Sequence, residues 1–243
     1  MKNLKIDCEN CCGLCCVSLF FAKVDGFPYD KDAGLPCKNM DEYFKCKIHS
    51  ELVSKEMKGC LSFDCFGAGQ KVTALYKGLN WSKTPEIAQE MFLVFNIMQQ
   101  LNQMLWYLKQ ADLEELSDEI EVLTNLSPKE LAKLELEKYH KIVYSELKEI
   151  VQPKGEPKIL FGKDFGRSNL DGEDFSGAYL IASNLEGCSL DSTVFLGADM
   201  RDVNIRNTDL SKARFLTQWQ INSAKGNKDT KLPAELSMPI TYV

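Results

Sequence analysis

The chain has 243 residues, of which 44% are hydrophobic, and its formal net charge is −6 at pH 7. This length is sufficient for one large domain or two small ones, each with its own hydrophobic core. The sequence pI near 5.2 and the lack of a cluster of Lys and Arg argue against a protein that binds nucleic acid by neutralising phosphates.

Membrane insertion and secretion are not expected from the sequence. The beginning of the chain has no apolar stretch long enough for a signal peptide. No later segment offers the roughly 18 uninterrupted apolar residues of a membrane span. We therefore expect a cytoplasmic protein that does not bind a membrane.

Residues 1–81 form a segment rich in cysteine and glycine with short apolar runs, a composition that cannot build a large core and is usually stapled by metal ions or disulfides. Only Cys188, of the ten cysteines, lies outside it. We predict a metal-binding module. Its candidate ligands are Cys8, Cys11, Cys12, Cys15, Cys16, Cys37, Cys46, Cys60 and Cys65.

The first five cysteines form two overlapping C-x-x-C motifs followed directly by a further cysteine. This spacing lets two thiolates reach one ion across a tight turn, and Gly13 supplies backbone freedom for it. The doubled Cys11 and Cys12 leave open which of the two is a ligand. His49, three residues after Cys46, is either a further ligand or an exposed or hydrogen-bonded histidine.

Three explanations compete for this cysteine cluster. A disulfide scaffold suits a secreted protein, and nine clustered cysteines are an odd number. Reduced structural thiols rarely crowd in this way. We favour metal, because nine cysteines suffice for two four-ligand sites with one to spare, and zinc and iron-sulfur clusters both accept four thiolates. Residues 67–70, Gly-Ala-Gly-Gln, are interpreted as a plain turn, with N–H groups aimed at an anion or cluster sulfur as the alternative.

The order of cysteine motifs resembles a known family. C-G-x-C-C, then Pro-Cys, Cys-x-Ile-His and Gly-Cys-x-x-Phe-x-Cys follow one another over residues 8–65. This order resembles the bacterial cysteine-rich family described as zinc- or iron-chelating proteins, and the resemblance implies a zinc or iron cofactor. An aromatic residue is more usual in that family where His49 stands.

Residues 82–152 have helical periodicity. Pro85 suits a first helical position, and apolar residues at three- and four-residue spacing predict a long helix that ends near Gln110. Capping boxes at Asp112/Glu115 and Ser127/Glu130 predict two further helices near 113–124 and 128–150. A helical hairpin or three-helix bundle is the simplest arrangement. The long helix is also a candidate homodimer interface.

A five-residue repeat follows a Pro- and Gly-containing linker at 152–157. A large apolar residue stands at every fifth position from Leu160 to Phe215, small residues occupy the position two before it, and Asp or Asn commonly lies between. Cys188 occupies one of the small positions. This pattern resembles the pentapeptide-repeat family, which implies a right-handed quadrilateral β-helix of about three turns over 158–216 in which residues twenty apart stack. Residues 217–243 are expected to form a C-terminal cap and tail.

The predicted fold class is therefore mixed, with a metal-stapled module, helices and a β-helix. No Ser-His-Asp or Cys-His pairing and no nucleotide loop is recognisable, so enzyme status stays open. The leading hypothesis is a cytoplasmic metal-binding protein whose repeat scaffold presents the metal module to a protein partner or small substrate. The alternatives are a redox-active or catalytic metalloenzyme with its site between the module and the helices, and an interaction adaptor whose metal is structural.

Overall fold

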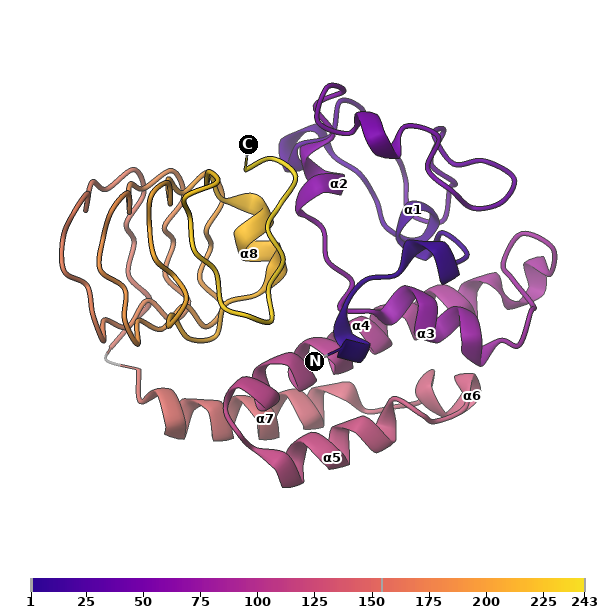
Figure 1. Cartoon of the computed structure of the whole chain (residues 1–243). Helices are drawn as coiled ribbons and strands as arrows, with labels where there is room; N and C mark the ends of the chain where they lie inside the picture. The colour runs from indigo at the N-terminus through magenta and orange to yellow at the C-terminus, as the bar shows by residue number, and fades with distance from the viewer. Residues whose placement is uncertain (1, 154, 243) are drawn as a thin grey trace. The chain divides into compact units, whose positions relative to one another are not determined.

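The computed structural model describes residues 2–153 and 155–242, and the chain divides into two compact units (Figure 1). The first unit comprises Met1–Cys60 and Asp64–Leu147, and the second comprises Leu61–Phe63 and Lys148–Val243. Among the described residues, none of the helices combines the length and the apolar character needed to cross a bilayer.

The N-terminal part of the first unit consists of loops joined by short helices, as its composition predicts. Single antiparallel bridges pair Phe21 with Lys31 and Met40 with Cys46. The short elements are η1 (Lys2–Leu4), η2 (Cys8–Asn10), α1 (Leu14–Ser18), η3 (Lys23–Asp25), η4 (His49–Glu51), α2 (Lys58–Ser62) and α3 (Ala68–Leu75).

The core of the first unit is organised by α4 (Ala88–Gln110), which follows the 3-10 turn η5 (Pro85–Ile87). The apolar stripe predicted for this helix is buried from Met91 to Leu108, and only Ile87, at its start, is partly exposed. The helix packs against α1, α3, α5 and α6. The stripe is therefore covered within the chain itself.

Three helices complete the helical segment: α5 (Glu114–Leu123), α6 (Pro128–Leu131) and α7 (Leu136–Val151) (Figure 1). The capping box of Ser127 and Glu130 is present at the start of α6. The box predicted at Asp112 is not formed, because Asp112 has a left-handed backbone with φ 54° and Leu113 becomes the N-cap of α5. The single helix predicted over 128–150 is interrupted between α6 and α7.

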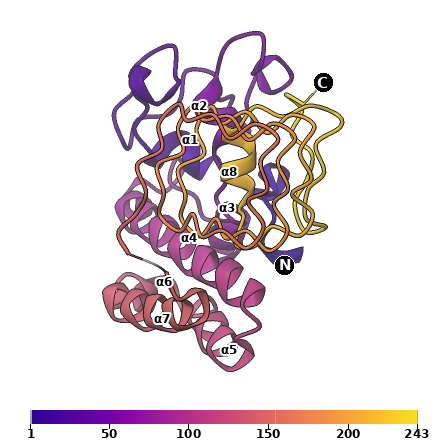
Figure 2. The ribbon, with the colours of Figure 1, turned by 90° about the vertical axis from the view of Figure 1, so that its left-hand side faces the viewer.

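The prediction of a right-handed quadrilateral β-helix is wrong. Over the described ranges 2–153 and 155–242 the backbone forms no β-strand and no sheet. The repeat is a stack of coil turns (Figure 2) joined by isolated parallel bridges such as Asp164 to Asn184. The reason is a left-handed residue at almost every fifth position, which ends each extended stretch before a strand can form. These residues are Gly162, Arg167, Gly172, Gly177, Ala182, Gly187, Ser192, Gly197, Asp202 and Asn207.

The predicted register of twenty residues is confirmed by these bridges, which continue from Asn184 to Asn204. Side-chain amides follow the same register, since Asn184 Nδ2 donates to Asp164 Oδ1 at 2.8 Å and Asn204 Nδ2 donates to Asn184 Oδ1 at 2.9 Å. Inside the coil, the rings of Phe175 and Phe195 stack with centroids 5.6 Å apart. The repeat thus has an apolar interior and a polar amide ladder.

The C-terminal segment continues the stack. Helix α8 (Gln218–Ser223) buries Ile221 completely, whereas Trp219 is 44% exposed. Beyond it, Lys225 and Lys231 make parallel bridges to Asn204 and Asp209. Tyr242 is buried and its hydroxyl donates to the carbonyl of Ile221 at 2.5 Å.

Candidate metal centre

Four cysteines from three segments surround one small cavity in the first unit. Cys8, Cys11, Cys15 and Cys65 line a space of about 20 Å³, and Phe95 of α4 closes it on the helical side. This volume is comparable to that of one water molecule. We call these four residues the first cysteine group.

Local backbone structure brings the first three cysteines of this group together. Cys8 begins η2, whose N–H groups are capped by the carboxylate of Asp7. Gly13 adopts a left-handed φ of 71° and begins α1, which carries Cys15. Burial raises the pKa of Cys11, and hydrogen bonds from the N–H groups of Leu14 and Gly13 oppose that shift by stabilising its thiolate.

The fourth cysteine of the group is placed by the start of α3. The segment interpreted as a plain turn is in fact the beginning of this helix, with Gly67 as its N-cap. Burial raises the pKa of Cys65 to about 11, whereas the N–H groups of Gly69 and Gly67 lower it. A Cβ atom at Gly69 would lie 2.7 Å from Cys11 Sγ and 3.8 Å from Cys65 Sγ. A side chain at position 69 would therefore displace the sulfur of Cys11.

We call Cys16, Cys37, Cys46 and Cys60 the second cysteine group, because burial, followed by repulsion from the thiolate forms of the other three, raises the pKa of Cys60 to about 12. Cys16 also raises the pKa of Cys8 and Cys11, so it lies near both groups. The pKa of Cys46 is likewise raised by burial and by Cys16 and Cys37. The backbone also links this group, since Cys37 N donates to the carbonyl of Cys16 at 3.0 Å.

Adjacent residues of α1 join the two groups. The sulfurs of Cys15 and Cys16 are 3.8 Å apart, and this contact raises the pKa of Cys15 and lowers that of Cys16. Lys31 adds a positive charge that also lowers the pKa of Cys16. Its ammonium lies within hydrogen-bond distance of four backbone carbonyls, which share its three N–H donors: those of Val17 at 3.3 Å, Leu19 at 2.5 Å, Asp32 at 3.0 Å and Leu35 at 2.8 Å.

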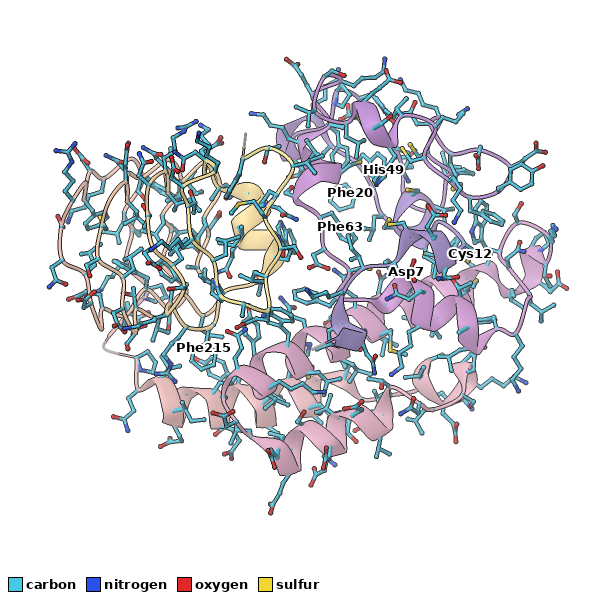
Figure 3. All side chains as sticks on the ribbon, in the orientation of Figure 1. Asp7, Cys12, Phe20, His49, Phe63 and Phe215 are labelled. Carbon is cyan, nitrogen blue, oxygen red and sulfur yellow. The ribbon has the colours of Figure 1, made fainter. Side chains whose placement is uncertain are left out.

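Two cysteines have structural surroundings instead. Cys12 is buried, its backbone N–H donates to Thr73 Oγ1 at 3.1 Å, and the Thr73 hydroxyl donates to its sulfur at 3.4 Å. Of the doubled pair, Cys11 thus lines the cavity and Cys12 does not. Cys188 is buried in the repeat, where its thiol donates to the carbonyl of Phe165 at 3.1 Å. His49 is exposed at the start of η4 (Figure 3).

The arrangement is one of gathered thiols rather than a closed coordination shell. All ten cysteines are free. In the part of the chain that the structure describes, no group of three or more Cys, His, Asp or Glu side chains is arranged to coordinate a single metal ion. The residues that sequence reasoning missed are Asp7, Lys31 and Phe95. Gly69 was weighed only in the alternative that N–H groups of residues 67–70 face a cluster sulfur, whereas nothing in the sequence identified Lys31.

The chain combines a cysteine-rich N-terminal segment with a C-terminal region of five-residue repeats that stack with a register of twenty residues. The family model for pentapeptide repeats matches residues 164–195 and 180–215, in 8 copies. A protein of Bacillus subtilis (strain 168) described as uncharacterized protein YybG is 40% identical over 262 residues, which cover 98% of this chain and 94% of the relative. The chain therefore belongs to the same family as YybG. No solved structure matches it.

Proposed function

We propose that this is a cytoplasmic metal-binding protein whose two cysteine groups each bind a metal centre, zinc or an iron-sulfur cluster. The observation that carries the proposal is that Cys8, Cys11, Cys15 and Cys65 line one cavity, while Cys16, Cys37 and Cys46 lie close enough to Cys60 to raise its pKa. Four thiolates are the donor set that structural zinc and iron-sulfur clusters prefer. The resemblance of residues 8–65 to the zinc- or iron-chelating family points the same way.

The first group fits a single ion by donor type and by size. Cys8, Cys11, Cys15 and Cys65 would supply its ligands, and the N–H groups of Gly67 and Gly69 would support the Cys65 thiolate. A space of about 20 Å³ suits one ion better than a four-iron cluster. Closing the coordination shell requires rotation of the cysteine side chains. A bound zinc ion would stabilise the fold of the loops, and an iron-sulfur cluster would supply electron transfer.

The repeat region serves in this proposal as a scaffold that presents the metal module to a partner. A redox or catalytic role is the second candidate, and one observation favours it. The cavity of the first group lies between the cysteine module and α4, which contributes Phe95. The 3.8 Å contact of the Cys15 and Cys16 sulfurs would place the two centres next to each other.

The test is to purify the full chain without oxygen and to measure metals, labile sulfide and visible absorption on the same sample. About two equivalents of colourless zinc would support structural sites. Iron with labile sulfide and a reversible redox transition would support the redox candidate. Protein that folds and binds neither metal when supplied with them would overturn the proposal.

Gly69→Ala is expected to weaken metal binding at the first group, because the added methyl restricts the positions open to the Cys11 sulfur, and to spare the second. The added methyl would stand 2.7 Å from Cys11 Sγ, inside van der Waals contact. Helix propensity alone predicts the opposite sign, a gain of up to about 1 kcal/mol for alanine in a helix. Metal content per chain measures the outcome, with Ala74→Ser on the exposed side of α3 as the control. Unchanged metal content in Gly69→Ala would show that Cys11 and Cys65 do not share an ion.

Metal affinity is expected to fall steeply as the pH is lowered. Burial raises the pKa of Cys8 to about 11 and that of Cys60 to about 12, so these thiols carry protons at neutral pH and binding must displace them. Up to about four protons leave per ion, and the apparent association constant should rise by up to about 10⁴ per pH unit. Competition with a chelator of known protonation behaviour between pH 6.5 and 8.5 measures the slope. A flat profile would contradict ligation by these thiols.

A further inference from the structure

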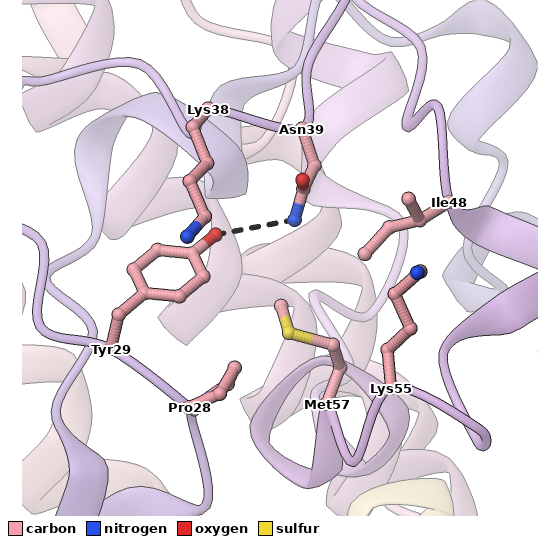
Figure 4. A pocket seen from close by; sticks show the side chains of 7 residues that line it. All are labelled: Pro28, Tyr29, Lys38, Asn39, Ile48, Lys55 and Met57. Carbon is pink, nitrogen blue, oxygen red and sulfur yellow. Dashed lines mark hydrogen bonds between the residues drawn. The ribbon is translucent and has the colours of Figure 1, made fainter.

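A second, larger cavity lies in the same unit and is not lined by any cysteine. Its volume is about 350 Å³, within the range of small-molecule sites. It is an open hollow lined by residues from three stretches, at positions 28–29, 38–39 and 48–57 (Figure 4). Neither the metal proposal nor the family resemblance assigns it a role.

The charged groups of this cavity are both cationic. Lys38 and Lys55 line it, and no acidic residue does. The ammonium of Lys38 stands 3.8 Å from the centroid of the Tyr29 ring, which holds it at the rim. Lys55 pairs with Glu51 at 3.3 Å, but both side chains are about half exposed, and such surface pairs are weak and readily exchanged. The cavity therefore favours an anionic group.

The part of the lining beside Lys55 is apolar. Met57 is only 2% exposed and points into the cavity together with Ile48 (Figure 4), while Pro28 lies at its edge. An inorganic ion would leave this surface without a partner. A small organic molecule with one negative head group and a short apolar tail would cover it and would gain from its burial.

A hydrogen-bonded wall connects the cavity with the second cysteine group. Asn39 Nδ2 donates to the Tyr29 hydroxyl at 3.3 Å, and the Tyr29 oxygen lies 3.2 Å from Cys37 Sγ. The backbone N–H of Asn39 also donates to Cys37 Sγ, at 3.4 Å. A ligand that contacts Tyr29 and Asn39 would thus touch two residues that are themselves in contact with Cys37 of that group.

From these four features we infer that the cavity binds a small organic anion, with its carboxylate or phosphate attracted by the ammonium groups of Lys38 and Lys55 and its apolar part against Met57 and Ile48. This inference goes beyond metal binding and holds whichever metal the cysteines carry. Binding would be sensed at Cys37 through Tyr29 and Asn39.

The experiment is to follow ¹³C-labelled methionine methyl groups of the full-length, metal-loaded protein while hexanoate, inorganic phosphate or hexylamine is added. Met57→Leu identifies the Met57 signal. We expect hexanoate to shift that signal saturably, phosphate to bind more weakly because it lacks a tail, and hexylamine to leave it unchanged because its head group is cationic. Tighter binding of phosphate than of hexanoate would overturn the inference that the ligand has an apolar part that packs against Met57 and Ile48.

Matched lysine variants test whether Lys38 and Lys55 bind the anionic head group. Lys38→Gln with Lys55→Gln is expected to weaken hexanoate binding by about tenfold or more, since charged hydrogen bonds are lost. Lys83→Gln, an exposed lysine outside the cavity, should change nothing. Equal shifts with hexanoate and hexylamine, or no shift of the Met57 signal with any anion, would overturn the inference. The metal content of each variant, measured in parallel, separates this outcome from failure of the metal proposal.

Discussion

Replacement of a single cysteine by serine in either group should lower the metal content of the chain from two centres to one. Cys11→Ser removes one of four thiols around the first cavity, and Cys60→Ser removes one from the second group. Structural zinc sites contribute about 10–16 kcal/mol at neutral pH, so loss of a ligand strongly weakens the whole site. The double variant should bind neither centre.

Two cysteines outside both groups, which are more buried than Cys11 and Cys60, provide controls for that experiment. Cys12→Ser and Cys188→Ser should both retain two centres, because Cys12 interacts with Thr73 and Cys188 donates to a repeat carbonyl. Metal analysis of the anaerobically purified variants measures the result. If Cys12→Ser removed metal and Cys11→Ser did not, the proposed division of the cysteines would be incorrect.

Phe195→Ala should destabilise the repeat unit by about 3–5 kcal/mol, the usual cost of truncating a fully buried aromatic side chain. Phe195 has no exposed surface and stacks on Phe175 in the preceding turn of the coil. The loss is large because neighbouring turns are joined by isolated bridges and cannot collapse into the space without breaking them. Denaturant unfolding of the full chain, followed by circular dichroism, measures the change.

Phe161→Ala is the matched control, since the same side chain is truncated in the first turn, where Phe161 is 58% exposed. It should cost less than about 1 kcal/mol. Equal losses for the two variants would mean that the turns of the coil do not stack about Phe195 as described. The metal content should be the same in both, because the cysteine groups belong to the other unit.

Several features of the fold could be predicted because they depend on periodicity. The stripe of α4 from Met91 to Leu108 is buried as its spacing predicts, and the twenty-residue register of the repeat appears in the bridges. The β-helix was predicted from the repeat by resemblance and was wrong. A left-handed residue in almost every repeat leaves room for single bridges only.

The candidate site shows the same division between local pattern and tertiary structure. The sequence by itself determined which cysteines cluster, that Gly13 permits a turn between them, and that Cys188 is part of the repeat interior. Only the tertiary structure decided that Cys65 joins Cys8, Cys11 and Cys15, and that Cys12 turns to Thr73. The physical reason is that thiols separated by fifty residues meet through the packing of α3 against η2. That packing depends on close contacts such as the one at Gly69, which spacing along the chain does not encode.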